Sequence, residues 1–345
     1  MESTREMKTG DIAAGSGNFS YKAFIVEETG KNEFTRVWKT ARIKDLPHGD
    51  VLIRVNYSSL NYKDALSATG NRGVTKKYPH TPGIDAAGVV EKSSVDMFQK
   101  GEKVIVTSYD LGMNTSGGFG QYIRVPADWV VKLPEGLDLK QSMVFGTAGF
   151  TAAMSIYKLT RTIKPEHGEI LVTGATGGVG SLAVGILAHL GYSVTGISGK
   201  TDTTLLKDLG IKNVIARKTF LENTKAPVLK PEWAGVIDTV GGEILATAIK
   251  STKLDGVITC CGNVASPDLP INVFPFILRG VSLLGIDSQH CPMGLRTKIW
   301  EKLAAEWKFE MLDKIYDEIF PDQLDDKIMQ MLKGKMKGRI IVNLN

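Results

Sequence analysis

The residues that most constrain this chain run from Ile170 to Gly180, with the sequence Ile-Leu-Val-Thr-Gly-Ala-Thr-Gly-Gly-Val-Gly. An apolar run typical of a β-strand ends in a glycine-rich turn, and a small-residue helical pattern follows to Leu190. Dinucleotide-binding turns have this order, because glycines let the backbone approach the pyrophosphate while free N–H groups at the helix start bind its charge. Glycine also serves ordinary turns, so the flanking strand and helix are what favour a cofactor site.

Strand and helix patterns alternate downstream of this turn. Such alternation predicts an α/β fold with a parallel sheet, helices on both faces and right-handed crossovers. The predicted strands are 170–173, 193–197, 213–215, 236–240, 256–260 and 281–286, and the predicted helices are 178–190, 203–209 and 243–254.

Upstream of Pro134 the chain instead shows short strand patterns separated by glycine and proline, which predict a β-rich, barrel-like domain. An isolated strand pattern, 339–344, must pair with another strand, and returning to the β-rich domain makes that domain discontinuous. We therefore expect a leader or expression remnant, a β-rich catalytic domain in two pieces and a nucleotide-binding domain between them. Their expected ranges are 1–20 for the leader, 21–145 with 289–345 for the β-rich domain, and 146–288 for the nucleotide-binding domain. The strands expected in the first piece are 21–26, 34–38, 51–55, 84–90, 103–107, 121–125 and 130–133, and the other expected helices are 141–159, 294–308 and 323–332.

Composition excludes several classes of protein. A net charge of +5 without a long block of like charge argues against nucleic acid as a partner. Three cysteines (Cys260, Cys261 and Cys291) cannot form a disulfide framework. No stretch approaches the length of an apolar membrane span, and residues 1–17 lack the apolar core of a signal peptide. These features predict a soluble, cytoplasmic protein that acts on a small-molecule substrate.

The end of the second predicted strand indicates which cofactor binds. An acidic residue there would bond the ribose hydroxyls of NAD, but this chain has Ser198, Gly199 and Lys200, and no acid before Asp202. A hydroxyl and an ammonium suit a 2′-phosphate, which favours NADPH, although Lys200 could be an ordinary solvated lysine. Arg217, after the third strand, could reach the same phosphate or stack on the adenine.

Five segments together resemble the medium-chain dehydrogenase/reductase superfamily, and within it the zinc-free YhdH/YhfP-type quinone oxidoreductases, which include NADPH-dependent acryloyl-CoA reductases. The resemblance implies a GroES-like catalytic domain and a Rossmann nucleotide-binding domain with a doubly wound parallel sheet. It also implies a homodimer, because strand 281–286 would leave an exposed sheet edge that pairs with a second copy. The segments are 61–64 (Asn-Tyr-Lys-Asp), 82–88, 146–152, 173–180 and 274–281.

The chain departs from the zinc alcohol dehydrogenases at their ligand positions. No cysteine stands within 61–64, Ile84 and Asp85 replace a His-Glu pair, and the five histidines are scattered. We therefore expect no catalytic metal. Without a Lewis acid to polarise an alcohol, hydride delivery to an activated acceptor such as an enone, enoyl thioester or quinone is the favoured chemistry.

The resemblance also implies the contacts of the cofactor. Thr176 to Val179 would lie against the pyrophosphate, and Ile277 and Ser288 would close over the nicotinamide. Cys260 and Cys261 form a vicinal pair that could be redox-active, but free cysteines are more often small buried apolar residues. The full set of expected cofactor contacts is Tyr62, Thr176, Gly177, Gly178, Val179, Gly180, Ser198, Gly199, Lys200, Arg217, Cys261, Ile277 and Ser288.

Hydride transfer to the β-carbon of an unsaturated carbonyl creates an enolate, which needs a hydrogen-bond donor and then a proton. By resemblance Asn61 and Tyr62 lie at the cleft, and Tyr62 could donate to the oxyanion or relay a proton. The alternatives are that Tyr62 only walls the nicotinamide pocket, since water competes with a weak phenol acid, and that Asp64 caps a helix over 65–68. Quinone reduction, and a non-enzymatic protein gated by NADPH, stay open as alternative functions.

Overall fold

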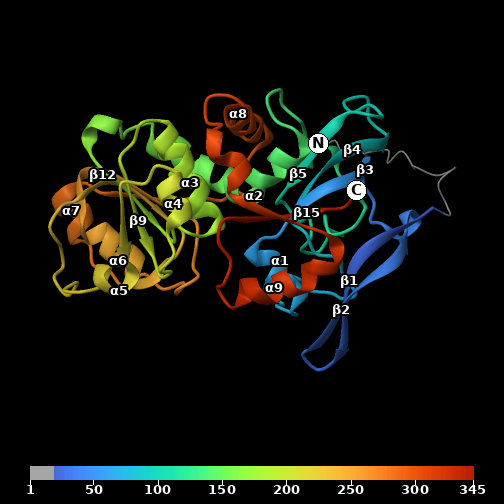
Figure 1. Cartoon of the computed structure of the whole chain (residues 1–345), viewed down its shortest axis with the longest axis horizontal. Helices are drawn as coiled ribbons and strands as arrows, with labels where there is room; N and C mark the ends of the chain where they lie inside the picture. The colour runs from blue at the N-terminus through green and yellow to red at the C-terminus, as the bar shows by residue number, and fades with distance from the viewer. Residues whose placement is uncertain (1–18) are drawn as a thin grey trace, which may run out of the picture.

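The computed structural model describes residues 19–345, which form three sheets, and helix α2 lies between the two larger ones (Figure 1). The leader expected over 1–20 lies outside the described residues except for its last two, and β1 begins at Ser20. The strands of the β-rich half are β1 (Ser20–Gly30), β2 (Glu33–Arg42), β3 (Val51–Ser59), β4 (Asp85–Ser93), β5 (Lys103–Thr107), β6 (Tyr122–Val125), β7 (Val130–Lys132), β14 (Tyr316–Ile319) and β15 (Arg339–Asn343). Those of the other half are β8 (Ile170–Thr173), β9 (Val194–Ser198), β10 (Asn213–Ala216), β11 (Trp233–Asp238), β12 (Thr252–Cys260) and β13 (Ser282–Gly285). The helices are α1 (Tyr62–Ala68), α2 (Leu139–Leu159), α3 (Gly178–His189), α4 (Thr204–Asp208), α5 (Arg217–Phe220), α6 (Gly242–Lys250), α7 (Phe274–Arg279), α8 (Met293–Ala304) and α9 (Leu324–Leu332).

The parallel sheet has the order β10-β9-β8-β11-β12-β13, and every neighbouring pair within it runs parallel. This is the doubly wound order that the alternating patterns predict. The direction of winding reverses between β8 and β11, and in such sheets ligands bind outside the carboxyl ends of the strands at this switch point. The glycine-rich turn directly follows β8, so it lies at that point.

Burial on both faces explains why the central strand β8 is almost continuously apolar. All four residues of β8 are buried. Leu171 packs with Leu245 and Ile249 of α6, and Val172 belongs to the core formed with α2 and α3 on the opposite side. Strand β13 forms one edge of the sheet, and its pairing with a second copy stays a prediction.

The β-rich half contains a seven-stranded sheet in which β15 pairs antiparallel with β3, with Val342 opposite Ser58. The last strand therefore returns to the first half of the chain, as its isolated position predicts. Strand β14, which the sequence pattern did not indicate, runs parallel to β15 at the sheet edge. The boundaries assigned to the two domains stay a prediction.

Several predicted element boundaries differ from the structure by a few residues, and in two of these places side chains satisfy backbone groups. The helix expected over 243–254 ends as α6 at Lys250, since the hydroxyls of Ser251 and Thr252 donate to carbonyl oxygens of its last turn. The strand expected over 236–240 ends as β11 at Asp238, whose carboxylate accepts the N–H groups of the following turn.

Helix α1 begins three residues before the predicted start, at Tyr62, so the expected cap position of Asp64 is wrong. Asn61 is the N-cap, with an extended backbone (φ −120°, ψ 164°). Asp64, the third helical residue, accepts the Asn61 N–H at 2.8 Å. Asp64 thus stabilises the helix start from inside the first turn, as the acid of a capping box does.

Helix α2 is broken at Gly146, whose φ of 50° and ψ of −155° are not helical. A Cβ there would lie 2.5 Å from Asp85 Oδ2 and 2.7 Å from Ser59 Oγ, so only glycine fits. The break leaves the N–H of Thr147 without a helical partner, and it donates to Asp85 instead. The second part of α2 therefore begins at a buried carboxylate, a favourable charge at a helix N-terminus.

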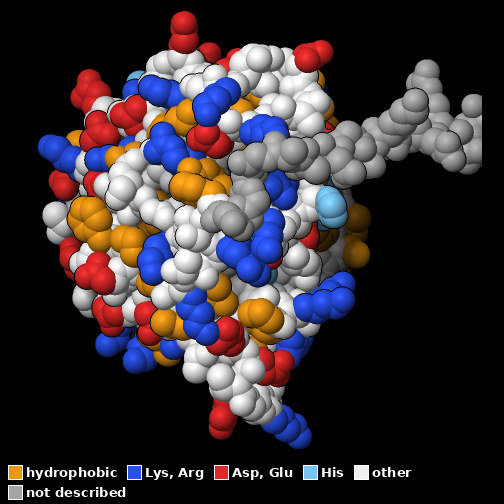
Figure 2. All heavy atoms as spheres, turned by 90° about the vertical axis from the view of Figure 1, so that its right-hand side faces the viewer, with side chains coloured by type: hydrophobic (Ala, Val, Ile, Leu, Met, Phe, Trp, Pro, Cys, Tyr) orange, Lys and Arg blue, Asp and Glu red, His pale blue; other side chains and the backbone are white. Residues whose placement is uncertain are grey.

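Across residues 19–345, none of the helices is both long enough and apolar enough to cross a membrane. On the face shown in Figure 2, basic side chains are mixed with acidic and apolar ones. This mixed surface agrees with the modest net charge of the chain.

Candidate functional site

The glycine-rich turn has the close backbone packing that its sequence predicts. Gly177 donates its N–H to Gly174 O at 2.9 Å, and α3 starts at Gly178. A Cβ at Gly180 would lie 2.3 Å from Gly174 O, so any side chain there would force the turn open. The first N–H groups of a helix have no partner within it, so this twelve-residue helix can hold an anion at its start.

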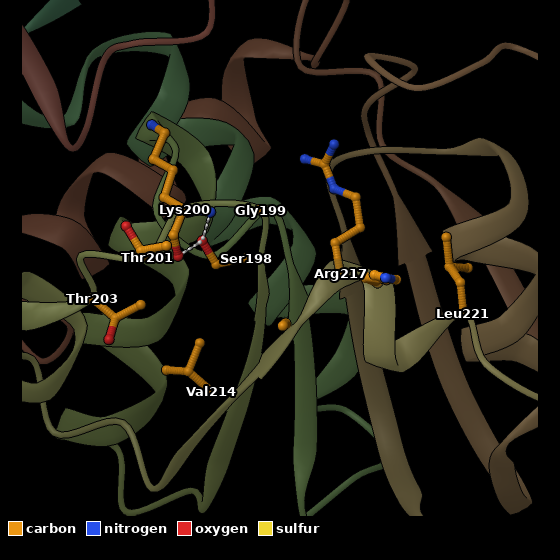
Figure 3. A pocket seen from close by; sticks show the side chains of 10 residues that line it. Ser198, Gly199, Lys200, Thr201, Thr203, Val214, Arg217 and Leu221 are labelled. Carbon is orange, nitrogen blue, oxygen red and sulfur yellow. Dashed lines mark hydrogen bonds between the residues drawn. The ribbon is translucent and has the colours of Figure 1, made fainter.

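A cavity of about 570 Å³ lies at the carboxyl end of β9, next to this turn. Ser198, Gly199 and Lys200 line one side of it, and Arg217 from the start of α5 lines another. The side chains of Lys200 and Arg217 extend in the same general direction on either side of Ser198 (Figure 3). The hydroxyls of Ser198 and Thr176 lie 3.2 Å apart, which connects the cavity to the glycine-rich turn.

Three cationic residues, Lys200, Arg217 and Lys218, line this cavity. The Lys200 ammonium donates to Met336 O, and burial, together with the charge of Lys337, lowers the pKa of Lys200. The guanidinium of Arg217 packs against Gly199, where a Cβ would lie 3.1 Å from Arg217 Cζ. The structure thus brings four of the expected contacts together in a cavity suited to an anion.

A second group, here called the polar cluster, comprises Ser59, Asn61, Asp85, Thr147 and Arg339. Asp85 accepts hydrogen bonds from Asn61 Nδ2 at 2.7 Å, Ser59 Oγ at 2.5 Å and Thr147 Oγ1 at 2.6 Å. Arg339 donates to Asn61 Oδ1 at 3.2 Å and to Ser59 Oγ at 2.8 Å, and its guanidinium lies 3.9 Å from the Asp85 carboxylate. Both ends of the Asn61 amide are therefore held, which fixes the start of α1.

Asp64 lies fully buried beside the polar cluster. Its carboxylate accepts N–H groups of Asn61 at 2.8 Å, Gly83 at 3.1 Å and Ile84 at 2.8 Å. These bonds favour the ionised form, but burial, and then the charge of Asp85, raises the pKa of Asp64 to about 7. Asp64, in the first turn of α1, is therefore a buried carboxyl group that changes its charge near neutral pH.

Tyr62 follows Asn61, and the residue is 45% exposed. Its neighbour Lys63 donates to Gln289 Oε1 at 2.8 Å, which ties the start of α1 to the segment where the chain returns from the parallel sheet. In that segment, Ser288 Oγ accepts a hydrogen bond from Thr151 of α2 at 2.9 Å. Tyr62 and Ser288 are thus brought to neighbouring segments, as the expected nicotinamide end of the cleft requires.

Cys261 and Ile277 have different surroundings. The Cys261 thiol donates to Asp238 O at 3.3 Å at the end of β11, near the switch point, and burial raises its pKa well above the usual range. A thiol that keeps its proton is a poor nucleophile, which favours packing over redox chemistry. Ile277 is 68% exposed on α7, and its expected contact with the nicotinamide stays a prediction.

No group of three or more His, Cys, Asp or Glu side chains within residues 19–345 is arranged to hold a metal ion. At the positions where zinc enzymes carry ligands by the expected resemblance, Ile84 is a buried apolar residue and Asp85 is engaged in the polar cluster.

Sequence reasoning missed Asp85, Thr147 and Arg339 as parts of the site. Asp85 and Arg339 are charged residues at the starts of strands β4 and β15, and an uncharged, mostly apolar run follows each of them directly. A charge within an apolar strand is the available signal, since buried charges are normally paired. That signal does not say which residue is the partner.

Comparisons with known proteins agree with this architecture. Residues 47–135 match the alcohol dehydrogenase GroES-like domain, and residues 178–307 match the zinc-binding dehydrogenase domain. The chain is 43% identical over 309 residues to YhfP of Bacillus subtilis, which carries the name of a quinone oxidoreductase (89% of this chain and 94% of YhfP). It is 42% identical over 330 residues to the acrylyl-CoA reductase AcuI of Ruegeria pomeroyi (94% of this chain and 99% of AcuI).

Solved structures are equally similar. The YhdH oxidoreductase of Salmonella enterica in complex with NADP superimposes with a TM-score of 0.91 at 37% identity, covering 94% of this chain and all (100%) of that one. YhfP with NAD bound gives a TM-score of 0.92 at 40% identity, with coverage of 95% and 100%. The chain therefore belongs to the medium-chain dehydrogenase/reductase superfamily, as an oxidoreductase of the group that contains YhfP, YhdH and AcuI.

Proposed function

We propose that this protein is a zinc-independent, NADPH-dependent reductase that delivers hydride to the β-carbon of an α,β-unsaturated carbonyl, either an acryloyl-CoA-like thioester or an enone. The observation that carries the proposal is the cavity at the end of β9, where Lys200 and Arg217 stand beside the glycine-rich turn. An NADP-bound relative and a relative named acrylyl-CoA reductase support the choice of cofactor and acceptor.

The residues present fit NADPH, which would supply the hydride. The N–H groups at the start of α3 would bind the pyrophosphate, and Ser198 and Lys200 would bind the 2′-phosphate. Tyr62 would form one wall of the nicotinamide pocket, with its hydroxyl or a water giving the proton to the α-carbon. Asn61 would hold Tyr62 in place, because both ends of its own amide are already bonded.

Quinone reduction is the second candidate, because YhfP carries that name. Both reactions need the same cofactor site and the same metal-free cleft. The acceptor therefore has to be identified by measuring turnover.

The test is consumption of NADPH by the purified protein with acryloyl-CoA, an enone and a naphthoquinone side by side. We expect kcat/KM to be highest for acryloyl-CoA, and NADH to be used less well than NADPH. Preference for the quinone would select the second candidate. Tight NADPH binding without turnover of any of the three would reject both reductase assignments.

A further inference from the structure

The segment Met336–Arg339, which leads into β15, contacts several parts of the candidate site at once. Met336 O accepts a hydrogen bond from the Lys200 ammonium, and Gly338 donates its N–H to Thr176 O at 3.2 Å. Arg339 enters the polar cluster. The β-rich half thus contacts Lys200, which lines the cavity at the end of β9, and Thr176 of the glycine-rich turn.

Within this segment, Lys337 forms an ion pair with Asp202. Asp202 stands between Thr201 and Thr203, which both line the cavity at the end of β9. The hydrogen bond from Lys337 lowers the pKa of Asp202, and burial, followed by the charge of Lys337, lowers the pKa of Lys200. Lys337 therefore lies close enough to affect both Asp202 and Lys200.

An unpaired carboxylate at this position would oppose binding of a 2′-phosphate, because like charges repel and the phosphate carries up to two negative charges. It would not oppose binding of a cofactor that has only hydroxyls at the ribose. Lys337 cancels this charge from the other half of the molecule.

We propose that Lys337 is a specificity-determining residue, which favours NADPH over NADH by neutralising Asp202 rather than by binding the phosphate itself. This inference rests on the proposed use of NADPH. It assigns part of the cofactor preference to a residue that lies 135 positions from Asp202 in the sequence.

The test measures dissociation constants of NADPH and NADH by fluorescence titration of the full chain. Lys337→Met should weaken NADPH binding about fivefold to tenfold and change NADH binding less than twofold. Lys335→Met, which removes the same charge from an exposed lysine two residues away, should change neither constant by more than twofold. The unchanged NADH constant also reports that the variant is folded.

A double variant separates neutralisation from direct contact. Adding Asp202→Asn to Lys337→Met should restore NADPH binding to within about twofold of the natural protein. Failure to restore it, an equal loss of NADH binding, or an equal effect of Lys335→Met would each overturn the proposal. A natural protein that binds NADH but not NADPH would reject the proposed cofactor, and this inference with it.

Discussion

The glycine-rich turn and the polar cluster are adjacent, yet they are built in opposite ways. Arg339 Nη1 lies 3.2 Å from the position that a Cβ of Gly178 would occupy. The turn is a contiguous run of sequence. It can bind an anion because its glycines have no side chains and the backbone N–H groups at the start of α3 have no partner within the helix. The cluster draws side chains from β3, β4, β15, the cap of α1 and the break in α2, and works because each polar group is paired.

This difference teaches how each region tolerates change. A backbone site is damaged by added volume, and a buried polar cluster is damaged by a lost partner. The first kind of damage should affect ligand binding most, and the second should affect folding most. Substitutions in each region test this contrast, and two more test residues beside the polar cluster, beginning with the largest expected effect.

Replacing Arg339 by Met should lower the free energy of unfolding by about 3–5 kcal/mol, because Asp85 is then left buried without its cation. Urea unfolding followed by circular dichroism measures the change. Lys333→Met, at an exposed lysine just after α9, removes the same charge and should cost less than about 0.5 kcal/mol. A loss below about 1 kcal/mol for Arg339→Met would show that the polar cluster does not need the arginine.

Replacing Gly180 by Ala should cost about 1–3 kcal/mol of stability, because the new methyl group overlaps Gly174 O. It should also weaken NADPH binding at least about tenfold, since a displaced turn no longer aims its N–H groups at the pyrophosphate. Gly294→Ala is the matched control, because a Cβ there meets nothing within 4 Å. Unchanged NADPH affinity in Gly180→Ala would contradict the site assigned to the turn.

The buried carboxyl of Asp64 predicts a pH effect. Its pKa rises from 3.8 in the unfolded chain to about 7 in the folded one, so the folded state holds the extra proton between these values. Wild-type stability should therefore fall as the pH rises from 5 to 8. Asp64→Asn cannot ionise, so the stability gap between wild type and variant should shrink by on the order of 1 kcal/mol over this range.

Urea unfolding at pH 5 and pH 8 gives this gap for each protein. Asp128→Asn, at an exposed position, is the control: its difference in unfolding free energy from wild type should be the same at pH 5 and pH 8. A gap for Asp64→Asn that widens toward pH 8 would mean that Asp64 is stabilised in its ionised form.

Tyr62→Phe should lower kcat with the best acceptor by less than about threefold if the ring only forms a wall of the cleft. General acid catalysis typically supplies about a hundredfold or more, so a loss of that size would assign the proton to the Tyr62 hydroxyl. Tyr157→Phe, on α2, serves as the control for removing a phenol elsewhere.

The sequence predicted most of the features that depend on residues close together in the chain. The alternating patterns gave the parallel sheet, and Ser198, Lys200 and Arg217 were placed together from their positions after successive strands. It could not predict what depends on pairing between distant segments. Asp85 and Arg339 each stand before an uncharged, mostly apolar run that does not identify a partner, and edge strand β14 has too little apolar pattern to be recognised.

The break in α2 shows the same limit. Gly146 lies within a run that reads as one helix, and its non-helical conformation is explained only by Asp85, Ser59 and Arg339 around it. Local pattern gives no reason for a break at this residue.

The position of Arg339 also has a consequence for the order of synthesis. The arginine that donates to the Asn61 amide is the 278th residue that a ribosome adds after Asn61. Until then Asp85 lacks its ion-pair partner, whereas the strands of the parallel sheet have all been made. In chains that fold as they emerge, the half with the parallel sheet can therefore form its core first, and the polar cluster is completed only when β15 arrives.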